Sequence, residues 1–253
     1  MSETPAGTLQ ADGAPLFLLD EVPAGDVVTV GGAEGRHAVD VLRLTVGERV
    51  RVADGRGLVV EGSVLGAEHA TLQVHVLARH DVPPPSPEFV LVQALPKGDR
   101  GPLAVDLATE LGVDRVVPWT AARCVTRWRE DRVDKGLAKW RSAARAASKQ
   151  ARRPRVPEVT EPMSTRQVIG MLADVDLALV LHEQARQPFA AVDVPATGTI
   201  AVIVGPEGGL TDGEVVAFRA AGAQSVRLGA EVLRTSTAGA AALAALGART
   251  RWR

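Results

Sequence analysis

Two apolar segments in the last fifth of the chain end in glycine-bearing turns, and each turn leads to the start of a helix. The first segment, 202–204, runs into Gly-Pro-Glu-Gly-Gly at 205–209, and the second reaches Gly229 through Leu228. Glycine accepts positive φ and lets a backbone approach a ligand closely. In α/β proteins, turns of this kind build ligand pockets at strand ends. The two turns are therefore predicted to form one pocket.

The part of the chain from residue 89 onward alternates between strand-like and helix-like segments. Strands are expected at 89–94, 115–118, 177–181, 200–204 and 225–228. Helices are expected at 103–111, 135–152, 211–221 and 236–246. Such alternation predicts an α/β fold with a mostly parallel sheet covered by helices, here in a domain over 89–253.

A different pattern precedes that domain. Short β-rich segments are expected as strands at 16–19, 27–30, 49–53, 58–65 and 71–77, with a short helix at 34–44 between them. They predict a small β-barrel domain over 15–80. Residues 81–88 contain three consecutive prolines, which favour an extended backbone and predict a linker. The small and polar residues 1–14 are expected to form a flexible tail.

The net charge of −1 hides a strongly basic segment. Residues 121–155 contain twelve Lys and Arg against three Asp and Glu. In the expected helix, one face is apolar and another carries the basic stripe Arg141, Arg145 and Lys149. A basic stripe on one helix can simply be solvated, but the excess continues on both sides of the helix. We therefore expect this segment to contact a polyanion such as RNA.

The composition excludes several other classes. Cys124 is the only cysteine, so an intramolecular disulfide and a cysteine-rich metal site are excluded. A small semi-buried residue is a better interpretation of Cys124 than a thiol nucleophile. The chain shows no signal-like start and no apolar run of membrane-spanning length, so a cytoplasmic protein without a membrane partner is expected.

The glycine turns do not match the common nucleotide-binding loops. Residues 205–209 lack the lysine and hydroxyl of a P-loop and the spacing of a dinucleotide site. Taken alone, such a turn is more often structural than functional. Leu181, Leu228 and Leu233 would add apolar walls to the backbone amides of both turns. A slot of this kind suits a flat heterocycle attached to a small charged group.

Residues 204–211 together with 228–238 resemble the signature of the SPOUT RNA methyltransferases. The resemblance is closer to one branch, the ribosomal RNA small subunit methyltransferase E family, which methylates N3 of a uridine in 16S ribosomal RNA. Segments 36–43, 54–57 and 97–113 are similar to that family's amino-terminal element, barrel turn and first catalytic-domain helix. The resemblance covers residues 16–248 in the same order.

This resemblance implies a PUA-like barrel followed by a SPOUT domain whose carboxy-terminal chain forms a trefoil knot. It implies a homodimer that uses S-adenosylmethionine as methyl donor, without a metal, on 16S ribosomal RNA or the assembled small subunit. The residues expected to line the cofactor are Leu181, Gly205, Gly209, Leu228 and Leu233. The remaining alternatives are another SPOUT reaction, such as ribose 2′-O-methylation, and a non-catalytic RNA-binding protein of ribosome assembly.

Methylation of uracil N3 requires loss of the N3 proton or stabilisation of the uracil anion. Arg234 is expected to stabilise that anion, and Glu207 to act as a base or as an orienting acceptor. The RNA contacts implied by the family, with the basic stripe, are Arg36, His37, Arg43, Arg123, Arg141, Arg145 and Lys149. The chain departs from the family pattern at Ser236, Pro102 and Leu107, so no catalytic role is assigned to these positions.

Overall fold

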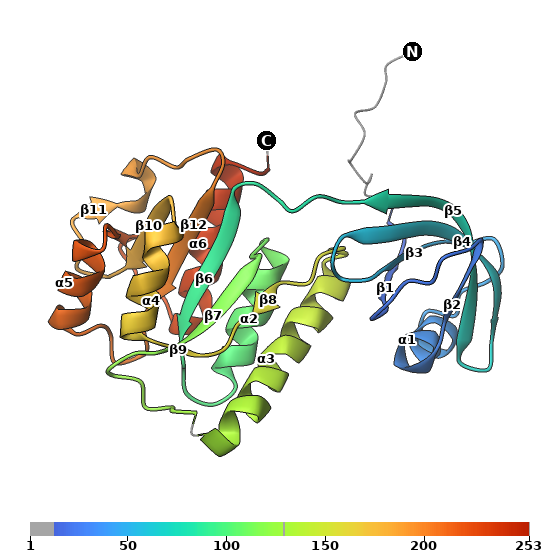
Figure 1. Cartoon of the computed structure of the whole chain (residues 1–253), viewed down its shortest axis with the longest axis horizontal. Helices are drawn as coiled ribbons and strands as arrows, with labels where there is room; N and C mark the ends of the chain where they lie inside the picture. Colours follow the sequence, from blue (N-terminus) through green and yellow to red (C-terminus); the bar gives the residue numbers. More distant parts are fainter. Residues whose placement is uncertain (1–12, 129, 253) are drawn as a thin grey trace, which may run out of the picture. The chain divides into compact units, whose positions relative to one another are not determined.

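The computed structural model describes residues 13–128 and 130–252 (Figure 1). Most of the predicted tail, residues 1–12, and Arg129 of the basic segment lie outside the described residues. Two compact units are present: residues up to 84 together with 148–156, and residues 85–147 together with 157–253. Within the described ranges, no helix is both long and apolar enough to cross a membrane.

The first unit contains a five-stranded sheet in the order β1-β3-β4-β5-β2. Its strands are β1 (Leu16–Leu18), β2 (Val27–Val30), β3 (Arg49–Ala53), β4 (Leu58–Glu68) and β5 (Thr71–Asp81). All five predicted strands are confirmed. Their inward-facing side chains, with Phe17 and Leu72 the largest, form the core of the unit.

The hairpin of β4 and β5 is longer than the apolar pattern indicates. Its tip pairs Glu68 with Thr71 across His69 and Ala70, which both have positive φ. Positive φ at both central residues matches the twist of a two-residue hairpin turn. None of the residues that extend the two predicted strands, 66–68 and 78–81, is buried, so the extra ladder has no buried apolar alternation that could have revealed it.

The predicted helix over 34–44 is shorter and less regular than expected. It consists of α1 (Gly32–Arg36) followed by a π-helical turn over His37–Val41. Ala38 is fully buried, but Val41 is 65% exposed and Leu42 is 40% exposed. Of these three apolar residues, only Ala38 therefore faces the core.

The carboxyl end of α3 (Glu130–Gln150) also belongs to the first unit. Lys149 Nζ lies 3.0 Å from the Glu34 carboxylate and 5.8 Å from the centre of the Phe17 ring. Arg155 follows the helix and donates to the carbonyl of Val82. These contacts tie the segment 148–156 to the β-rich unit.

The second unit contains an eight-stranded sheet in which every pairing is parallel. The order is β11-β13-β10-β12-β6-β7-β8, with β9 also paired to β7. The five expected strands are confirmed as β6 (Glu88–Ala94), β7 (Arg115–Thr120), β10 (Leu177–Leu181), β12 (Thr199–Val204) and β13 (Gln224–Arg227). The edge strands β8 (Glu158–Val159), β9 (Met163–Ser164) and β11 (Gln187–Pro188) are two-residue elements too short for a sequence pattern.

Helices cover this sheet (Figure 1). The expected helices are confirmed as α2 (Arg100–Glu110), α3, α5 (Asp212–Ala220) and α6 (Thr235–Arg249), and α4 (Thr165–Met171) is an addition. Helices α2 and α6 pack against each other. A Cβ on Gly239 of α6 would lie 2.8 Å from Leu91 of β6, so the absent side chain allows close packing. Trp119 of β7 meets Phe218 of α5 edge to face at 5.4 Å.

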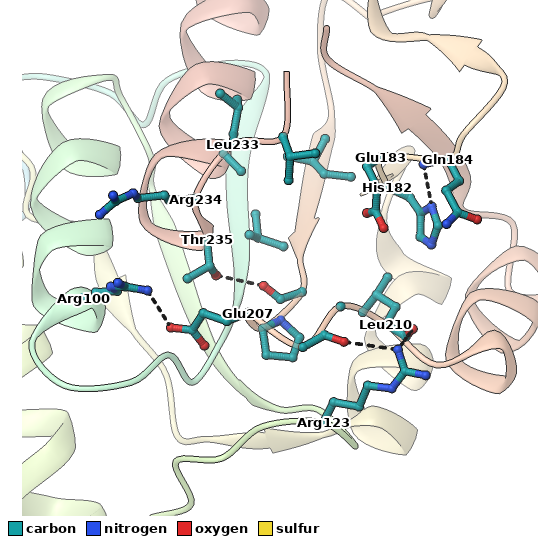
Figure 2. A pocket seen from close by; sticks show the side chains of 18 of the residues that line it. Arg100, Arg123, His182, Glu183, Gln184, Glu207, Leu210, Leu233, Arg234 and Thr235 are labelled. Carbon is teal, nitrogen blue, oxygen red and sulfur yellow. Dashed lines mark hydrogen bonds and ion pairs between the residues drawn. The ribbon is translucent and has the colours of Figure 1, made fainter. Parts of the chain in front are cut away.

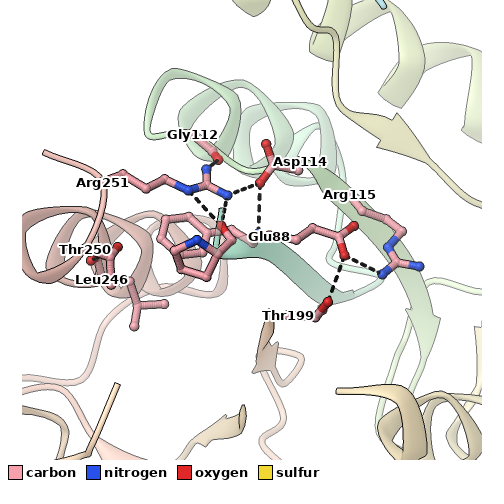
Figure 3. A network of polar contacts seen from close by, with 10 residues as sticks. Glu88, Gly112, Asp114, Arg115, Thr199, Leu246, Thr250 and Arg251 are labelled. Atoms are coloured by element: carbon pink, nitrogen blue, oxygen red, sulfur yellow. Dashed lines mark hydrogen bonds and ion pairs between the residues drawn. The ribbon is translucent and has the colours of Figure 1, made fainter. Parts of the chain in front are cut away.

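A polar network at the amino ends of the central strands anchors the carboxy-terminal segment (Figure 3). Arg251 donates to the carbonyls of Pro87 and Gly112 and pairs with Asp114. Its guanidinium also lies 3.8 Å from the ring centre of Phe89. Because these contacts gather at the amino ends, they leave the carboxyl ends of the same strands open for a site.

The chain between β13 and α6 takes an unusual route. Strand β13 is separated from β6 by β10 and β12, yet α6 packs on β6 and β12. Residues 228–234 therefore cross the carboxyl ends of the intervening strands. This route brings the second glycine turn to the first.

Candidate active site

A cavity of about 540 Å³ lies at the carboxyl ends of β10 and β12. The predicted turns form much of its wall (Figure 2). Its lining comprises Arg100, Arg123, Leu181, His182, Glu183, Gln184, Val204, Gly205, Pro206, Glu207, Gly208, Gly209, Leu210, Asp212, Val232, Leu233, Arg234, Thr235 and Ala238. The mixture of apolar side chains, backbone groups and a few charges is typical of a small-molecule site.

A hydrogen-bond chain joins the two turns beneath the cavity. Thr235 Oγ1 donates to the carbonyl of Gly205 at 2.8 Å, and Gln93 Nε2 donates to Thr235 Oγ1 at 3.0 Å. Gln93 is fully buried in β6, where the other side chains from Phe89 to Ala94 are apolar. Its Oε1 has no hydrogen-bond partner among the described residues. Burying a side-chain amide costs free energy unless it is hydrogen-bonded. The bonds of Gln93 and Thr235 therefore hold the end of β6, the first glycine turn and the start of α6 in fixed positions.

The first turn owes its shape to small residues and to Arg123. A Cβ on Gly205 would lie 3.0 Å from Leu210 Cδ2, and Gly209 has φ +70°. Arg123 Nη1 donates to the carbonyls of Gly208 and Leu210 at 3.1 and 3.0 Å. The predicted RNA contact Arg123 therefore lines the cavity and braces the turn with the same guanidinium.

Glu207 is held at the rim by two donors. Its Oε1 accepts from the backbone N–H of Lys97 at 3.1 Å and from Arg100 Nη1 at 3.3 Å. Partial burial raises the pKa of Glu207, but backbone hydrogen bonds and the Arg100 charge outweigh burial and lower the pKa below its ordinary value. A carboxylate held in its ionised form is a weak base, so this geometry favours the orienting role over the role of base.

Arg234 immediately precedes α6 and lines the cavity. Its backbone carbonyl accepts the bonds that open the helix, from the N–H groups of Thr237 and Ala238. Its guanidinium is exposed and makes no hydrogen bond or ion pair to any residue that the structure describes. An unpaired cation at the mouth of a pocket is available to a substrate anion.

The five predicted cofactor residues come together. Leu181, Gly205, Gly209 and Leu233 line the main cavity. Leu228 lines a hollow of about 90 Å³ that adjoins it and shares Leu181 and Leu233.

The predicted RNA contacts divide differently. Arg36, His37 and Arg43 lie in the first unit, with both arginines exposed and His37 half-buried. Arg141 donates to the Val159 carbonyl and pairs with Glu161 at 3.0 Å. Arg145 also has an interaction within the chain, and Lys149 is paired with Glu34. The three side chains of the predicted stripe on α3 therefore all have partners within the protein.

Several residues of the site were missed by the sequence reasoning, namely Gln93, Arg100, His182 and Gln184. His182 Nδ1 accepts from the Gln184 backbone N–H at 3.1 Å, which assigns the ring proton of the neutral imidazole to Nε2. A lone polar residue inside an apolar strand was an available signal for Gln93. Arg100, His182 and Gln184 follow the ends of strands and belong to no distinguishing motif, so the sequence offered no signal for them.

Cys124 is buried, as expected, and burial raises the pKa of its thiol, which is the opposite of an activated nucleophile. In the described part of the chain, no group of three or more His, Cys, Asp or Glu side chains is arranged to hold a metal ion.

Two family models match the chain. An RNA methyltransferase domain matches residues 83–247, and an RNA methyltransferase PUA domain matches residues 30–77. The parallel sheet with its pocket at the strand ends and the preceding β-rich unit thus define an RNA methyltransferase that carries a PUA domain.

Curated relatives and solved structures narrow this class. "Ribosomal RNA small subunit methyltransferase E" of Mycobacterium bovis is 44% identical over 245 residues, covering 94% of both chains. The Bacillus subtilis protein of the same name is 27% identical and covers 92% of this chain and 93% of its own. The Neisseria gonorrhoeae enzyme of that name, solved bound to S-adenosyl methionine, superposes with a TM-score of 0.82 at 29% identity, covering 94% of this chain and 98% of its own. The chain belongs to the ribosomal RNA small subunit methyltransferase E family.

Proposed function

We propose that the protein transfers a methyl group from S-adenosylmethionine to N3 of a specific uridine in 16S ribosomal RNA. One observation carries this proposal: the two glycine turns, pinned together by Thr235, enclose a cavity whose mouth presents the free guanidinium of Arg234. Family membership and the relative solved with S-adenosyl methionine support the donor and the class of RNA.

The lining fits that cofactor. Leu181 and Leu233 offer apolar contact to a flat adenine, while the backbone of residues 205–209 offers hydrogen-bonding groups. The small Gly205 keeps the wall clear, since a Cβ there would press on Leu210. When bound, S-adenosylmethionine supplies an electrophilic methyl group, so the protein must supply binding, alignment and stabilisation of the nucleophile.

Arg234 stabilises the uracil anion that forms as N3 loses its proton. The guanidinium stays charged at neutral pH. It forms no hydrogen bond or ion pair with a described residue, so no existing contact has to break before it binds the uracil anion. Glu207 accepts from Lys97 and Arg100 and thereby fixes the rim, while the N3 proton passes to solvent water. N3 lies on the pairing edge of the base, so the uridine must be unpaired or flipped out to reach the cavity.

Arg36, His37 and Arg43 supply further RNA contact from the PUA domain. Basic side chains on a small β-domain bind the phosphate backbone without reading the bases, which suits a protein that recognises folded RNA.

We also infer a trefoil knot and a homodimer. The crossing of 228–234 over the ends of β10 and β12 and the return of α6 to β6 support a threaded chain. The exposed Leu103 on α2, beside the alanine-rich α6, supports a second copy packed on this helix pair. The ribosomal RNA target named for the relatives supports a cytoplasmic enzyme that acts on 16S ribosomal RNA or on the assembled small subunit.

Mass mapping of 16S ribosomal RNA from cells with and without the protein tests this proposal. The account expects one N3-methyluridine to disappear when the protein is removed and to return with a plasmid copy. Loss of a ribose 2′-O-methyl mark instead would favour the rival SPOUT reaction, and an unchanged map would favour a non-catalytic RNA-binding protein.

A further inference from the structure

Two hollows flank the start of α5, and each contains two exposed arginines. One hollow, of about 550 Å³, is lined by Arg127 and Arg166. The other, of about 620 Å³, is lined by Arg186 and Arg219. None of the four guanidinium groups bonds to a residue within 13–128 or 130–252. Four unpaired arginines around one helix form a surface that attracts a polyanion.

The hollows lie on different sides of the same helix. Gly213, Glu214 and Ala217 face the Arg127 side, whereas Asp212, Val215 and Arg219 face the Arg186 side. Each set follows the three- to four-residue spacing of one helical face. The first turn of α5 is therefore a ridge with basic hollows on both sides.

The ridge borders the active-site cavity directly. His182, Gln184 and Asp212 line both that cavity and the Arg186 hollow. Ala122, in the Arg127 hollow, adjoins Arg123, which lines the cavity and braces the first glycine turn. A strand of RNA that delivers a base to the cavity from this side passes next to the ridge.

The carboxylates that line the hollows are Asp212 and Glu214. Glu214 is buried, and its oxygens already accept from the N–H of Ala122 and from the hydroxyls of Thr165 and Thr211. Burial raises the pKa of Glu214, but these hydrogen bonds outweigh burial and lower it, so the carboxylate is committed to holding the fold. Neither Asp212 nor Glu214 forms an ion pair with any of the four arginines among the described residues, so the charge of these arginines is available to a ligand.

The basic stripe on α3 differs in this respect, because Arg141 and Lys149 have carboxylate partners at 3.0 Å. A paired cation would have to break its ion pair to bind phosphate, whereas the arginines beside α5 need not. Unpaired basic charge is therefore present next to the site of chemistry.

We propose that the single-stranded RNA on either side of the target uridine crosses the start of α5, with its phosphates contacting Arg127 and Arg166 in one hollow and Arg186 and Arg219 in the other. This inference rests on the proposed function. The guanidinium fork suits phosphate oxygens, and contacts of this kind position a strand without reading its sequence. Holding the backbone on both sides of a flipped base offsets the cost of unstacking it.

The test compares three double variants of the full-length protein. Arg127→Gln/Arg166→Gln and Arg186→Gln/Arg219→Gln each remove two charges from one hollow. The matched control, Lys135→Gln/Lys139→Gln, removes two charges from α3, where both side chains are exposed and unpaired within the described ranges. The probes are purified small ribosomal subunits lacking the modification, titrated at several salt concentrations, and S-adenosylmethionine alone in a calorimeter.

Each arginine pair is expected to weaken RNA binding by about tenfold or more and to reduce the slope of log affinity against log salt by about 1.4, the value for two single-strand phosphate contacts. The lysine control should change RNA affinity less than twofold, and all three variants should bind S-adenosylmethionine like the wild type. Wild-type RNA affinity in both arginine pairs, or a larger loss in the lysine control, would overturn the inference. Failure of the proposed function is distinguishable, because the wild-type protein itself would then bind no S-adenosylmethionine or would form no N3-methyluridine, whatever its RNA affinity.

Discussion

The hydroxyl of Thr235 donates a 2.8 Å hydrogen bond to the carbonyl of Gly205 and so joins two turns that are 30 residues apart in the chain. Gly205 immediately follows β12, and Thr235 opens α6 after the chain has crossed the carboxyl ends of the intervening strands. Because Thr235 also accepts from the buried Gln93, the cavity is fixed to the central strand of the sheet. The pocket is thus preorganised by the core rather than by its own loops.

Replacing this hydroxyl should weaken the cofactor site. Thr235→Val keeps the side-chain shape but leaves the Gly205 carbonyl without its donor, at a cost of about 1–3 kcal/mol for an unsatisfied buried group. We expect the affinity for S-adenosylmethionine to fall roughly 5- to 150-fold, as measured by calorimetry. Thr235→Ser retains the hydroxyl and should bind within about threefold of wild type. Equal binding by the Val and Ser variants would show that the bond does not shape the site.

Arg234→Ala should remove catalysis without unfolding the protein. The guanidinium is exposed and bonded to no described residue, so the change in stability should stay within about 0.5 kcal/mol. Loss of the cation that stabilises the developing anion should lower kcat by roughly 100- to 1000-fold. Single-turnover methyl transfer to small subunits measures this, with thermal unfolding as the control. Arg234→Lys keeps the charge but not the planar guanidinium, so its kcat should lie between those of the wild type and the Ala variant. Near wild-type turnover in the Ala variant would exclude Arg234 as the group that stabilises the anion.

Glu207 should contribute a pH-dependent part of the stability. Its folded-state pKa lies below the ordinary value of 4.5, so its contribution is complete above that pH and is lost as the pH falls through the lowered folded-state pKa. Chemical denaturation of the wild type and Glu207→Gln should therefore show a stability gap at pH 7 that narrows below about pH 4.5. A gap that widens on acidification would mean that the carboxylate is not stabilised by Lys97 and Arg100.

Lys149 should act mainly in folding. Its ammonium is largely buried between Glu34 and the Phe17 ring. Removing the ammonium leaves the partly buried Glu34 carboxylate without its ion-pair partner, which is destabilising. Lys149→Ala should lower the unfolding free energy by about 1–3 kcal/mol, whereas Lys135→Ala on the exposed face should change it by less than about 0.5 kcal/mol. Denaturant titration measures both. Unchanged stability with a large loss of RNA affinity in Lys149→Ala would instead restore its predicted role as an RNA contact.

Much of the fold could be predicted because its longer elements carry strong local signals. The apolar runs of β6, β10 and β12 and the capping box at Thr211 are contiguous in sequence and were located nearly to the residue. The end of the hairpin at Glu68 carries no apolar alternation, and the two-residue strands and the return of 148–156 to the first unit depend on distant partners. Contacts with distant residues do not produce a helical or strand-like hydrophobic period in the local sequence, so these features could not be predicted from it.

The lining of the cavity could be predicted where residue type and position coincided, as at the glycine turns and Arg234. The ionic state of Glu207 was not predictable, because it depends on Lys97 and Arg100, which come from another strand end. Arg127 beside α5 lies in the basic segment predicted to contact RNA, but Arg166, Arg186 and Arg219 do not. These three are scattered in the sequence and had no local signal, whereas Arg141 and Lys149 of the dense stripe on α3 are paired with carboxylates inside the protein.

Methyl transfer to uracil N3 can be measured by incubating the purified protein with methyl-labelled S-adenosylmethionine and unmodified small ribosomal subunits, and mapping the label by mass spectrometry of the digested RNA. We predict about one methyl group per subunit, on N3 of a single uridine, and none with Arg234→Ala. Label on a ribose or on another base, or no transfer by a protein that binds both the cofactor and the subunit, would contradict this prediction.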